Sequence, residues 1–426
     1  GDISLAGVPV GQLVAQYGTP LMLIDQDDFF TRGKKVKSAF EKAATGIGSS
    51  AKIYYAGKSL LTTEIVKWID QLGLNLDVST GGELALALSG GISPNRIGLH
   101  GNNKSLYEIG RAVTANVGAI VIDSEIEIER IASVAGAQDK IQPVRIRVNS
   151  GIHAYTHEYL ATAREDQKFG IAISDVPALV AKIRSHSHLK FLGLHSHIGS
   201  QIFENDSFEI SAQRLIELLA KYRDEYSAEL PELDLGGGYG IAYLPGENSL
   251  DPASTMKDLA TVVTAQCAAH KLAIPRISIE PGRAIVGPTM FTLYEVGTVK
   301  DVTLENGAIR RYVSVDGGMS DNLRPALYDA QYFAALANRT SSAPKVSSRI
   351  VGKHCETGDI VIREIELESD IVPGDLLATP ATGAYGRSMA TNYNHVPRPP
   401  VIAVKDGKAR VILRRETEAD LLGLDI

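Results

Sequence analysis

The stretch Ile53-Tyr54-Tyr55-Ala56-Gly57-Lys58-Ser59-Leu60 is a short apolar and aromatic run that leads into a lone Lys. If this run is a buried strand, Lys58 presents an amine at the carboxyl end of that strand. A desolvated amine in such a place can stay partly neutral and form a Schiff base with an aldehyde cofactor or a carbonyl substrate. A solvated Lys at a strand end is the commoner arrangement, so the rest of the chain has to decide between the two interpretations.

Similar apolar runs recur from about residue 27 onward, between segments of helical composition. Such runs are typical of strands that are buried on both faces. They cover residues 52–57, 74–78, 96–99, 119–122, 144–148, 191–195, 233–235 and 276–279. Eight strands alternating with helices over about 250 residues predict an α/β fold, the (β/α)8 TIM barrel, whose active site lies at the carboxyl ends of the strands.

A different pattern begins after Pro281, where alternating or β-branched stretches are separated by Gly, Asn and Asp. The stretches cover residues 291–299, 308–315, 359–368 and 401–413. This pattern is typical of an antiparallel β domain. We therefore expect a second, mainly antiparallel domain in the C-terminal part of the chain.

The N-terminal segment is expected to belong to this second domain. Residues 5–17 have the apolar spacing of a helix, and residues 20–25 follow a Gly-Thr-Pro break as a strand. A strand ahead of the barrel has no better partner than the β domain. The predicted domains are a barrel over 27–279 and a β-sandwich or barrel-like domain formed by 1–26 and 280–426.

Composition and charge exclude several classes of protein. The 426 residues carry a net charge of −7 without a cluster of Lys and Arg, which argues against nucleic acid and anionic membranes as partners. No apolar run approaches the roughly 18 residues that span a bilayer, and no secretory signal is recognisable, so we expect a cytoplasmic protein. Cys267 and Cys355 are too few for a disulfide framework or a Cys-built zinc site, so each matters only as a thiol.

The residues that follow the eight predicted strands decide whether this barrel has an active site. Nearly every strand end carries a group able to do acid–base or hydrogen-bonding work, whereas ordinary loops would show mixed turn residues. In chain order the ends carry Lys58, Asp77 and Ser79, His100 and Asn102, Asp123, Asn149, His195 and His197, Gly236-Gly237-Gly238, and Glu280 with Arg283.

The glycines Gly236-Gly237-Gly238 follow the seventh predicted strand. In barrels that bind phosphorylated ligands, the phosphate often lies on the loops after strands seven and eight, where backbone N–H groups converge. Three glycines let the backbone approach an anion closely, although a flexible turn is the alternative. The position in the barrel favours a phosphate site.

Glu280 follows the eighth predicted strand and has two interpretations. A carboxylate at a barrel mouth can pair structurally with Arg283, and on its own this is the simpler reading. Together with an amine at Lys58 and a phosphate loop, Glu280 matches the needs of pyridoxal phosphate (PLP). A carboxylate beside the pyridine nitrogen keeps that nitrogen protonated, so that the ring can accept electrons from the Cα of the substrate.

His195 and His197 alternate on one predicted strand and are expected to point the same way. Two such side chains can bind a metal, but no third ligand of suitable type follows nearby in the sequence. A flat imidazole stacked on a flat cofactor ring explains His197 better. We therefore expect no metal.

The chain resembles the fold-type III PLP decarboxylases, which are alanine-racemase-like barrels with a C-terminal β domain. The resemblance runs in unbroken order from about residue 17 to Tyr393. It is carried by the motifs Tyr55-Ala56-Gly57-Lys58, His195-Ser196-His197-Ile198-Gly199-Ser200, Gly236-Gly237-Gly238, Glu280-Pro281-Gly282-Arg283 and Cys355-Glu356-Thr357-Gly358-Asp359. Within that group the chain is most similar to the diaminopimelate decarboxylases, on residues 195–201, 324–328 and 382–386.

The resemblance implies a role for each matching position. Lys58 would carry PLP, His197 would stack on its ring, and Glu280 would pair with the pyridine nitrogen. Further residues would complete the site: Ser200, Gly237 and Gly238 at the phosphate, Tyr385 beside them, Asp77 among the cofactor-binding residues, and Arg283, Arg324, Tyr328 and Tyr385 toward the distal end of the substrate.

The resemblance also implies a homodimer with shared active sites. Cys355 and Glu356 would come from the partner subunit, Cys355 as proton donor to Cα after carbon dioxide leaves, and Glu356 toward the distal ammonium group. Thr357 stands where the family often has Ser, a conservative difference. Without the motif, Cys355 would be read as an ordinary buried thiol.

The implied activity is the decarboxylation of meso-2,6-diaminopimelate to L-lysine and carbon dioxide, the last step of bacterial lysine synthesis. Arg324 supports it, because a distal carboxylate calls for a bidentate guanidinium. Alternatives are a decarboxylase for carboxynorspermidine or arginine, an alanine racemase, and a PLP-barrel protein that binds without turnover. Intact Lys58, Glu280 and Cys355 speak against the last of these.

Overall fold

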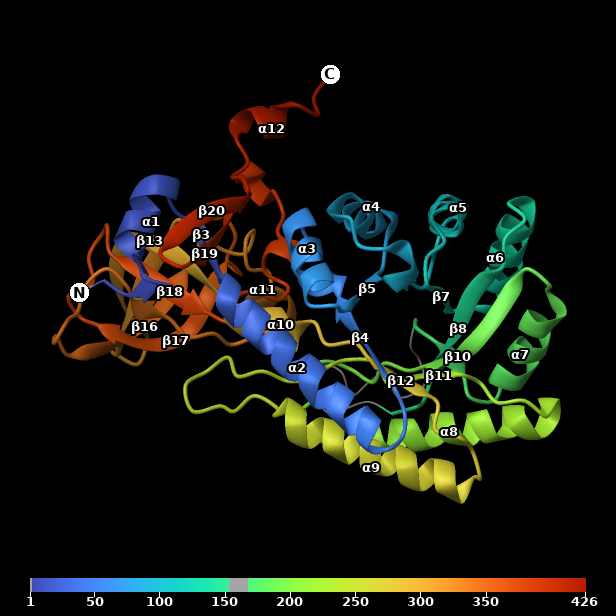
Figure 1. Ribbon diagram of the computed structural model, residues 1–426. Coiled ribbons are helices and arrows are strands. Elements are labelled where there is room, and N and C mark those ends of the chain that lie inside the picture. Colours follow the sequence, from blue (N-terminus) through green and yellow to red (C-terminus); the bar gives the residue numbers. More distant parts are fainter. Residues whose placement is uncertain (1, 153–167) are drawn as a thin grey trace. The chain divides into compact units, whose positions relative to one another are not determined.

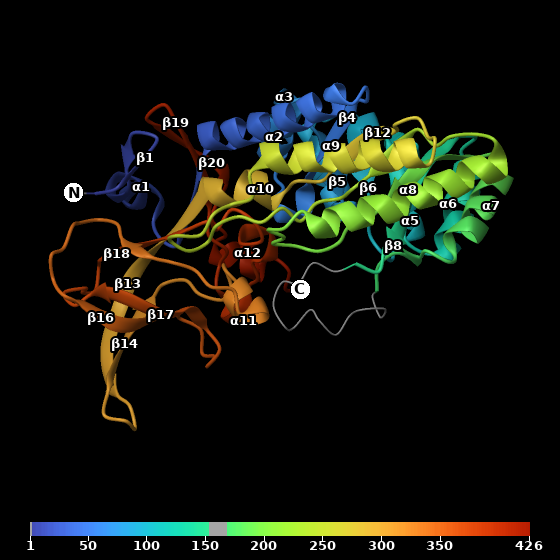
Figure 2. The same ribbon diagram turned by 90° about the horizontal axis from the view of Figure 1, so that it is seen from below.

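The computed structural model describes residues 2–152 and 168–426 (Figures 1 and 2). These residues form two compact units. The barrel unit comprises residues 32–240 and 249–284, and the sheet unit comprises residues 1–31, 241–248 and 285–426.

Within the described residues of the barrel unit, eight parallel strands form the closed sheet, one at each predicted position. They are β4 (Ala51–Ala56), β5 (Asn75–Val78), β6 (Ile97–Leu99), β7 (Ala119–Ile122), β8 (Gln142–Asn149), β10 (Leu189–His195), β11 (Glu232–Asp234) and β12 (Arg276–Ile279). Parallel pairing of β8 with β10 and of β12 with β4 closes the sheet on itself. The predicted (β/α)8 barrel is therefore confirmed. A short strand, β9 (Ile171–Ala172), pairs with the end of β8.

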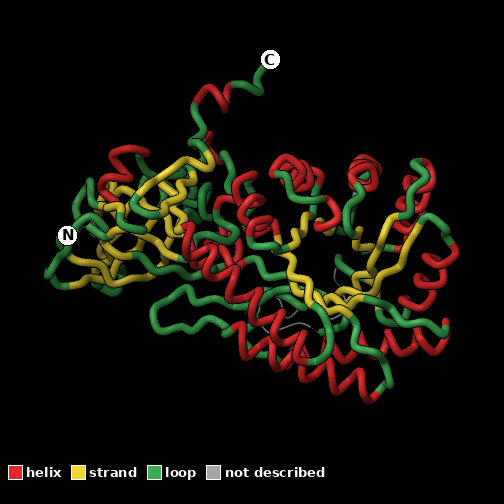
Figure 3. Tube along the Cα trace, in the orientation of Figure 1, coloured by secondary structure: helices red, strands yellow, loops and turns green. Residues whose placement is uncertain are grey.

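Helices lie outside the arc of strands in the barrel unit (Figure 3). They are α2 (Gln26–Gly46), α3 (Thr63–Gln71), α4 (Gly81–Gly90), α5 (Leu106–Ala115), α6 (Glu125–Ala137), α7 (Val176–Ser185), α8 (Asp206–Tyr226) and α9 (Pro252–Ala269). The connections also contain the short helix α10 (Arg283–Val286) and the 3-10 turns η1 (Gly57–Ser59) and η2 (Pro94–Arg96).

Side-chain caps set where several of these helices begin. The hydroxyls of Thr62 and Thr80 accept the N–H groups of Ile65 and Glu83, and Ser105 forms a capping box with its helix. Each cap ends the loop that leaves a strand, so the strand-end residues of the site sit on short connections between two ordered elements.

The sheet unit is built on a second sheet in the order β17-β16-β14-β13-β3-β19-β20. Its strands are β3 (Leu21–Asp25), β13 (Met290–Thr303), β14 (Ile309–Val315), β15 (Ala335–Leu336), β16 (Lys345–Val351), β17 (Ile360–Glu368), β18 (Leu376–Pro380), β19 (Val401–Lys405) and β20 (Lys408–Leu413). Most pairings are antiparallel, but β14–β16 and β3–β19 are parallel. β3 lies between β13 and β19, so the N-terminal strand belongs to this sheet as predicted.

Short helices complete the sheet unit: α1 (Val10–Tyr17), α11 (Arg324–Tyr328), α12 (Glu418–Leu422) and the 3-10 turns η4 (Gly287–Thr289), η5 (Arg387–Met389) and η6 (Tyr393–His395). Its core packs the buried side chains of α1 and β3 against those of β13 and β19, including Leu13, Leu23, Leu293 and Ile402. This burial of apolar area anchors the first residues of the chain to its last strands.

The prediction of a helix over residues 5–17 is wrong at its start. β1 (Ser4–Leu5) and β2 (Val8–Pro9) form a hairpin, and α1 begins only at Val10. Ala6 and Gly7 both have positive φ, 45° and 85°, which is the conformation of a tight two-residue hairpin turn. The apolar residues at positions 5 and 8 fit helical spacing, but this turn places them on paired strands.

No helix among the described residues is both long enough and apolar enough to cross a membrane.

Candidate active site

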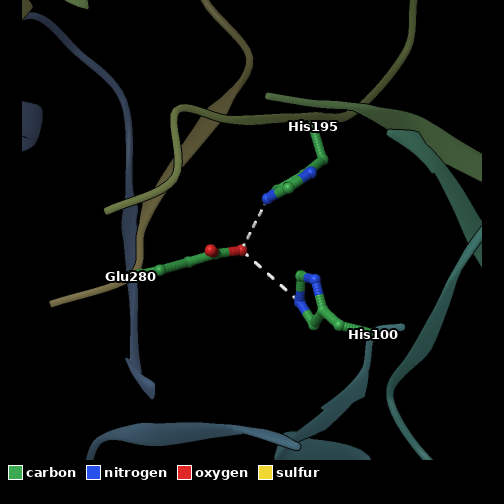
Figure 4. A group of neighbouring side chains, drawn as sticks. All are labelled: His100, His195 and Glu280. Carbon is green, nitrogen blue, oxygen red and sulfur yellow. Dashed lines mark ion pairs between the residues drawn. The ribbon is translucent and has the colours of Figure 1, made fainter. Parts of the chain in front are cut away.

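Three side chains from three strand ends converge inside the barrel unit (Figure 4). Nε2 of His195, at the end of β10, lies 2.9 Å from Oε1 of Glu280, which follows β12. Nε2 of His100, which follows β6, lies 3.4 Å from the same oxygen. All three residues are buried, yet these three atoms have no hydrogen-bond partner within the described residues. Buried polar groups are normally hydrogen-bonded, so this cluster has the capacity to bind a further group.

Asp77, at the end of β5, extends the cluster. Its Oδ1 lies 3.2 Å from Nε2 of His100, and neither carboxyl oxygen has a hydrogen-bond partner in the described part of the chain. Burial and the nearby charge of Glu280 raise the pKa of Asp77 well above its usual value. Burial and Glu280 likewise raise the pKa of Asp234, at the end of β11, to about 6. Several carboxyl groups therefore share a space in which not all can be ionised.

The imidazoles beside Glu280 are neutral at neutral pH. Burial lowers the pKa of His195 to about 3 and lowers the pKa of His100 well below its usual value. A neutral imidazole does not compensate the charge of a carboxylate. The group that Glu280 lacks is therefore a cationic donor, and a protonated pyridine nitrogen is one.

The same three residues, His100, His195 and Glu280, also have the spacing of a metal site, because their ligand atoms lie within 4.8 Å of one another. The sequence near His195 offers no third metal ligand, but His100 and Glu280 come from distant strand ends and complete the set. His197 does not belong to this set. Glu280 has no ion pair with Arg283 among the described residues, and the side chains that lie against its carboxylate are the two neutral imidazoles. The structural pairing considered for Glu280 and Arg283 is therefore not present.

Lys58 lies in η1 directly after β4, at the predicted strand end, and its side chain is exposed. The turn that carries it is held from both sides: Ser59 Oγ donates to the carbonyl of Ala56 at 2.7 Å, and Tyr55 Oη donates to the carbonyl of Leu60 at 2.9 Å. Within the described residues Lys58 has no hydrogen bond or ion pair. Its amine is therefore available to a ligand.

His197 is held with one ring nitrogen as an acceptor. The N–H of Gly237 donates to Nδ1 of His197 at 3.4 Å. Burial and the charge of Lys58 lower the pKa of His197 well below its usual value. The lowered pKa leaves His197 as a neutral, flat ring.

The three glycines after β11 are needed for packing. A Cβ on Gly237 would lie 2.2 Å from the carbonyl oxygen of Glu280, and one on Gly238 would lie 2.4 Å from that of Gly199. The loops after β10, β11 and β12 therefore touch backbone to backbone, and the N–H of Glu280 donates to the carbonyl of Gly236 at 2.8 Å. The three glycines therefore lie in a closely packed loop, which differs from the flexible turn considered as the alternative interpretation.

Ser200 and Arg283 lie side by side next to these loops. Arg283 Nη2 donates to Ser200 Oγ at 2.9 Å. A hydroxyl and a cationic guanidinium this close together are suited to bind an anion, because both can donate hydrogen bonds to it. Arg283, which the sequence analysis assigned to the substrate, therefore lies beside a residue predicted to bind the phosphate.

The remaining predicted site residues belong to the sheet unit. Arg324 is buried, Tyr385 is half-buried, and Tyr328, Cys355 and Glu356 are exposed. Arg324 begins α11, and Cys355 and Glu356 lie on the loop between β16 and β17.

The loop that carries Cys355 is held by Asp359 of its own motif and by His354, Ser320 and Asn394, which carried no signal in the sequence. Asn394 Oδ1 accepts the N–H of Cys355 at 3.2 Å and lies 3.2 Å from Nδ1 of His354. Nε2 of His354 lies 2.8 Å from Ser320 Oγ. The carboxylate of Asp359 accepts the N–H of His354 at 2.8 Å. The thiol is exposed, but the backbone beneath it is fixed.

Arg324 is buried without a counter-charge. Among the described residues it has no ion-pair partner, and its guanidinium donates to the hydroxyl of Tyr332. Neither Tyr332 nor its neighbour Tyr243 lies in a motif that the sequence analysis used. Tyr332 follows Arg324 closely in the sequence, and this proximity was the one available sign of a contact between them. A buried cation without an anion is costly, so this site calls for an anionic ligand.

A closed parallel barrel with an available amine at its first strand end, and a buried carboxylate between two neutral imidazoles at its last, has the features of a PLP enzyme. Residues 33–287 match the family model described as "Pyridoxal-dependent decarboxylase, pyridoxal binding domain". The chain is 50% identical to the diaminopimelate decarboxylase of Mycobacterium tuberculosis, over 100% of this chain and 95% of that one. It is 39% identical to the enzyme of that name from Bacillus subtilis, over 100% and 95%. The chain therefore belongs to the diaminopimelate decarboxylase family, as predicted.

The fold agrees with this family. The solved diaminopimelate decarboxylase from M. jannaschii in co-complex with L-lysine superimposes with a TM-score of 0.91 at 28% identity, over 100% of this chain and 96% of that one. PLP is the cofactor of such enzymes. The residues described above fit it, because Lys58 is free to bond to an aldehyde, Glu280 lacks a cationic donor, and Ser200 and Arg283 provide donors for a phosphate.

Proposed function

We propose that this chain decarboxylates meso-2,6-diaminopimelate at its D-configured centre and releases L-lysine and carbon dioxide. The observation that carries the choice of substrate is Arg324, a buried guanidinium without a counter-charge in the described residues. A distal carboxylate supplies that charge through two parallel hydrogen bonds. The stereochemistry follows from the family alone.

PLP, when bound, supplies a ring that accepts the electron pair released as the bond between Cα and the carboxylate breaks. Lys58 would hold the aldehyde carbon of the cofactor, because its amine stands at the end of β4 without an ion-pair partner in the described chain. Glu280 would hold a proton on the pyridine nitrogen. The neutral rings of His100 and His195 limit the space around Glu280 without adding a competing charge.

The loops after β10, β11 and β12 would bind the phosphate. Ser200, Gly237 and Gly238 carry this role in our proposal, with the guanidinium of Arg283 beside the Ser200 hydroxyl. The neutral ring of His197 would stack on the cofactor and exclude water from that face. Burial and the charge of Glu280 raise the pKa of Asp77 well above its usual value, which disfavours a second negative charge beside Glu280.

In the sheet unit, Arg324, Tyr328 and Glu356 would bind the distal amino-acid end of the substrate, and Tyr385 would border cofactor and substrate. Cys355 would donate a proton to Cα after carbon dioxide leaves. We propose that Cys355 and Glu356 act in the site of a partner subunit, so that the working form is a homodimer. Both Cys267 and Cys355 are unpaired thiols, in keeping with the proposed cytoplasmic location.

The test is a steady-state comparison of four substrates with PLP present: meso-diaminopimelate, L-lysine, L-ornithine and L-arginine. The last three lack the distal carboxylate and leave Arg324 unpaired, so their kcat/KM should be at least about 100-fold lower. Arg324→Ala should narrow that gap. A higher kcat/KM for ornithine or arginine would assign the chain to another decarboxylase, and the absence of turnover with every substrate would support a binding protein.

A further inference from the structure

The guanidinium of Arg324 is oriented by two tyrosines of the sheet unit. Tyr332 accepts a hydrogen bond from Nη1 of Arg324 through its hydroxyl. The carbon at the centre of the guanidinium lies 4.6 Å from the ring centroid of Tyr243 and 5.5 Å from that of Tyr332. The two rings meet edge to face, with centroids 5.3 Å apart at an interplanar angle of 83°. Arg324, Tyr332 and Tyr243 are 6%, 3% and 9% exposed.

These contacts restrict an otherwise flexible side chain. A guanidinium is planar and offers five N–H donors in a fixed fork. The hydrogen bond to the Tyr332 hydroxyl and the Tyr243 ring beside the guanidinium fix the orientation of the Arg324 fork. Most of the N–H donors of Arg324 remain available to a ligand. Because a long side chain that is ordered before binding loses less entropy on binding, such a cage raises affinity for the ligand.

We propose that Tyr243 and Tyr332 are specificity-determining positioning residues, which hold the fork of Arg324 for the distal carboxylate of the substrate. This inference rests on the proposed function and extends it to two residues that do not themselves have to touch the substrate. Tyr243 comes from residues 241–248, which join the sheet unit although they directly follow the glycine loop of the barrel in sequence.

The proposal predicts a particular kinetic signature. The distal carboxylate does not change its charge while the bond at the other end of the substrate breaks. Arg324 therefore binds the ground state and the transition state equally, and a misplaced fork raises KM while kcat stays the same. Loss of a hydrogen bond to a charged group corresponds to about a tenfold change.

The first experiment measures kcat and KM for meso-diaminopimelate in the PLP-loaded wild type and in Tyr332→Phe and Tyr243→Leu. We expect KM to rise about tenfold in both variants, with kcat within about twofold of wild type. Tyr243→Phe keeps the ring and should restore the wild-type KM. Tyr222→Phe is the matched control. Tyr222, on α8, accepts a hydrogen bond from Arg184 of α7 at 2.6 Å, and the centre of that guanidinium lies 5.6 Å from the Tyr222 ring centroid. This pair lies on the outer helices, so KM should stay at the wild-type value.

The second experiment separates the carboxylate from the rest of the ligand. L-lysine and 1,5-diaminopentane differ by one carboxylate, so their inhibition constants report the contribution of Arg324 at equilibrium. In Tyr332→Phe the constant for L-lysine should rise about tenfold, and that for 1,5-diaminopentane should stay the same. Three results would overturn the proposal: equal changes of the two inhibition constants, a fall in kcat at constant KM, or an unchanged KM in both Tyr332→Phe and Tyr243→Leu. A wild type that does not turn over meso-diaminopimelate would instead overturn the proposed function.

Discussion

Single residues set the charge of the cofactor site. Glu280 lies beside His100 and His195, which burial keeps neutral, and near Asp77, whose pKa burial and the charge of Glu280 raise well above its usual value. Glu280 is the carboxylate that we propose for the pyridine nitrogen, and the neutral imidazoles beside it do not compete for that role. The electronic role of this residue can be tested separately from its role in binding.

Glu280→Gln should retain PLP but lose turnover by a factor on the order of 100 or more, because a neutral amide no longer stabilises a protonated pyridine in the transition state. Absorbance of the bound cofactor and kcat for meso-diaminopimelate are the two measurements. Near-normal turnover in this variant would show that the carboxylate has a structural role only.

The raised pKa of Asp234 predicts a pH effect on stability. Its pKa of about 6 lies above the value of an exposed Asp, so the folded chain binds more protons than the unfolded chain between about pH 4 and pH 6. The stability that Asp234 contributes is thus present at low pH and is lost as pH rises through 6. In the PLP-free protein, the Tm of wild type minus that of Asp234→Asn should fall between pH 5 and pH 7. The exposed Asp139→Asn is the control, and a constant difference for Asp234→Asn would contradict the assigned shift.

At the scale of elements, the site depends on how closely three loops pack. The loops after β10, β11 and β12 touch through their backbones at Gly199, Gly237 and Glu280. The caps at Thr62, Thr80 and Ser105 set where the helices after β4, β5 and β6 begin. Small displacements of such connections would move strand-end side chains relative to one another.

Gly237→Ala should therefore weaken PLP binding and lower Tm. The new Cβ would lie 2.2 Å from the carbonyl oxygen of Glu280, so one loop has to move, at a cost of about 1–3 kcal/mol. We expect the dissociation constant of PLP to rise about tenfold or more. Gly110→Ala in α5 is the matched control, because nothing lies within 4 Å of its added Cβ, and it should be neutral or slightly stabilising. Equal behaviour of the two variants would contradict the packing argument.

At the scale of the whole molecule, the predicted residues divide between the two units. Lys58 and Glu280 belong to the barrel unit, and Arg324, Cys355 and Glu356 belong to the sheet unit. The exposed position of Cys355 and Glu356 supports the proposal that they act in a partner subunit.

Mixing the inactive variants Lys58→Ala and Cys355→Ala should restore activity. If subunits reassort at random, about a quarter of all sites combine two intact halves in a symmetric dimer. Recovery is measured as turnover after mixing, with subunit exchange monitored independently. Exchange without recovery would show that each chain builds its own site.

The pattern of the chain was sufficient to predict its eight barrel strands, because each strand is buried on both faces and therefore reads as an uninterrupted apolar run. The motifs at the strand ends were sufficient to predict the family. The hairpin at residues 4–9 was not predicted, because the apolar residues at positions 5 and 8 fit a helix and a tight hairpin equally well.

The sequence by itself determined the barrel, the second sheet and the candidate residues Lys58, Glu280 and Arg324, since local composition and motifs specify them. Only the tertiary structure decided their partners. His100 meets Glu280 although 180 residues of chain separate them, and Tyr243 lies against Arg324 from a segment that follows the barrel's glycine loop. Parallel strands bring distant strand ends to the same edge of a barrel, so neighbours in space are set by strand order and register, which no local pattern records.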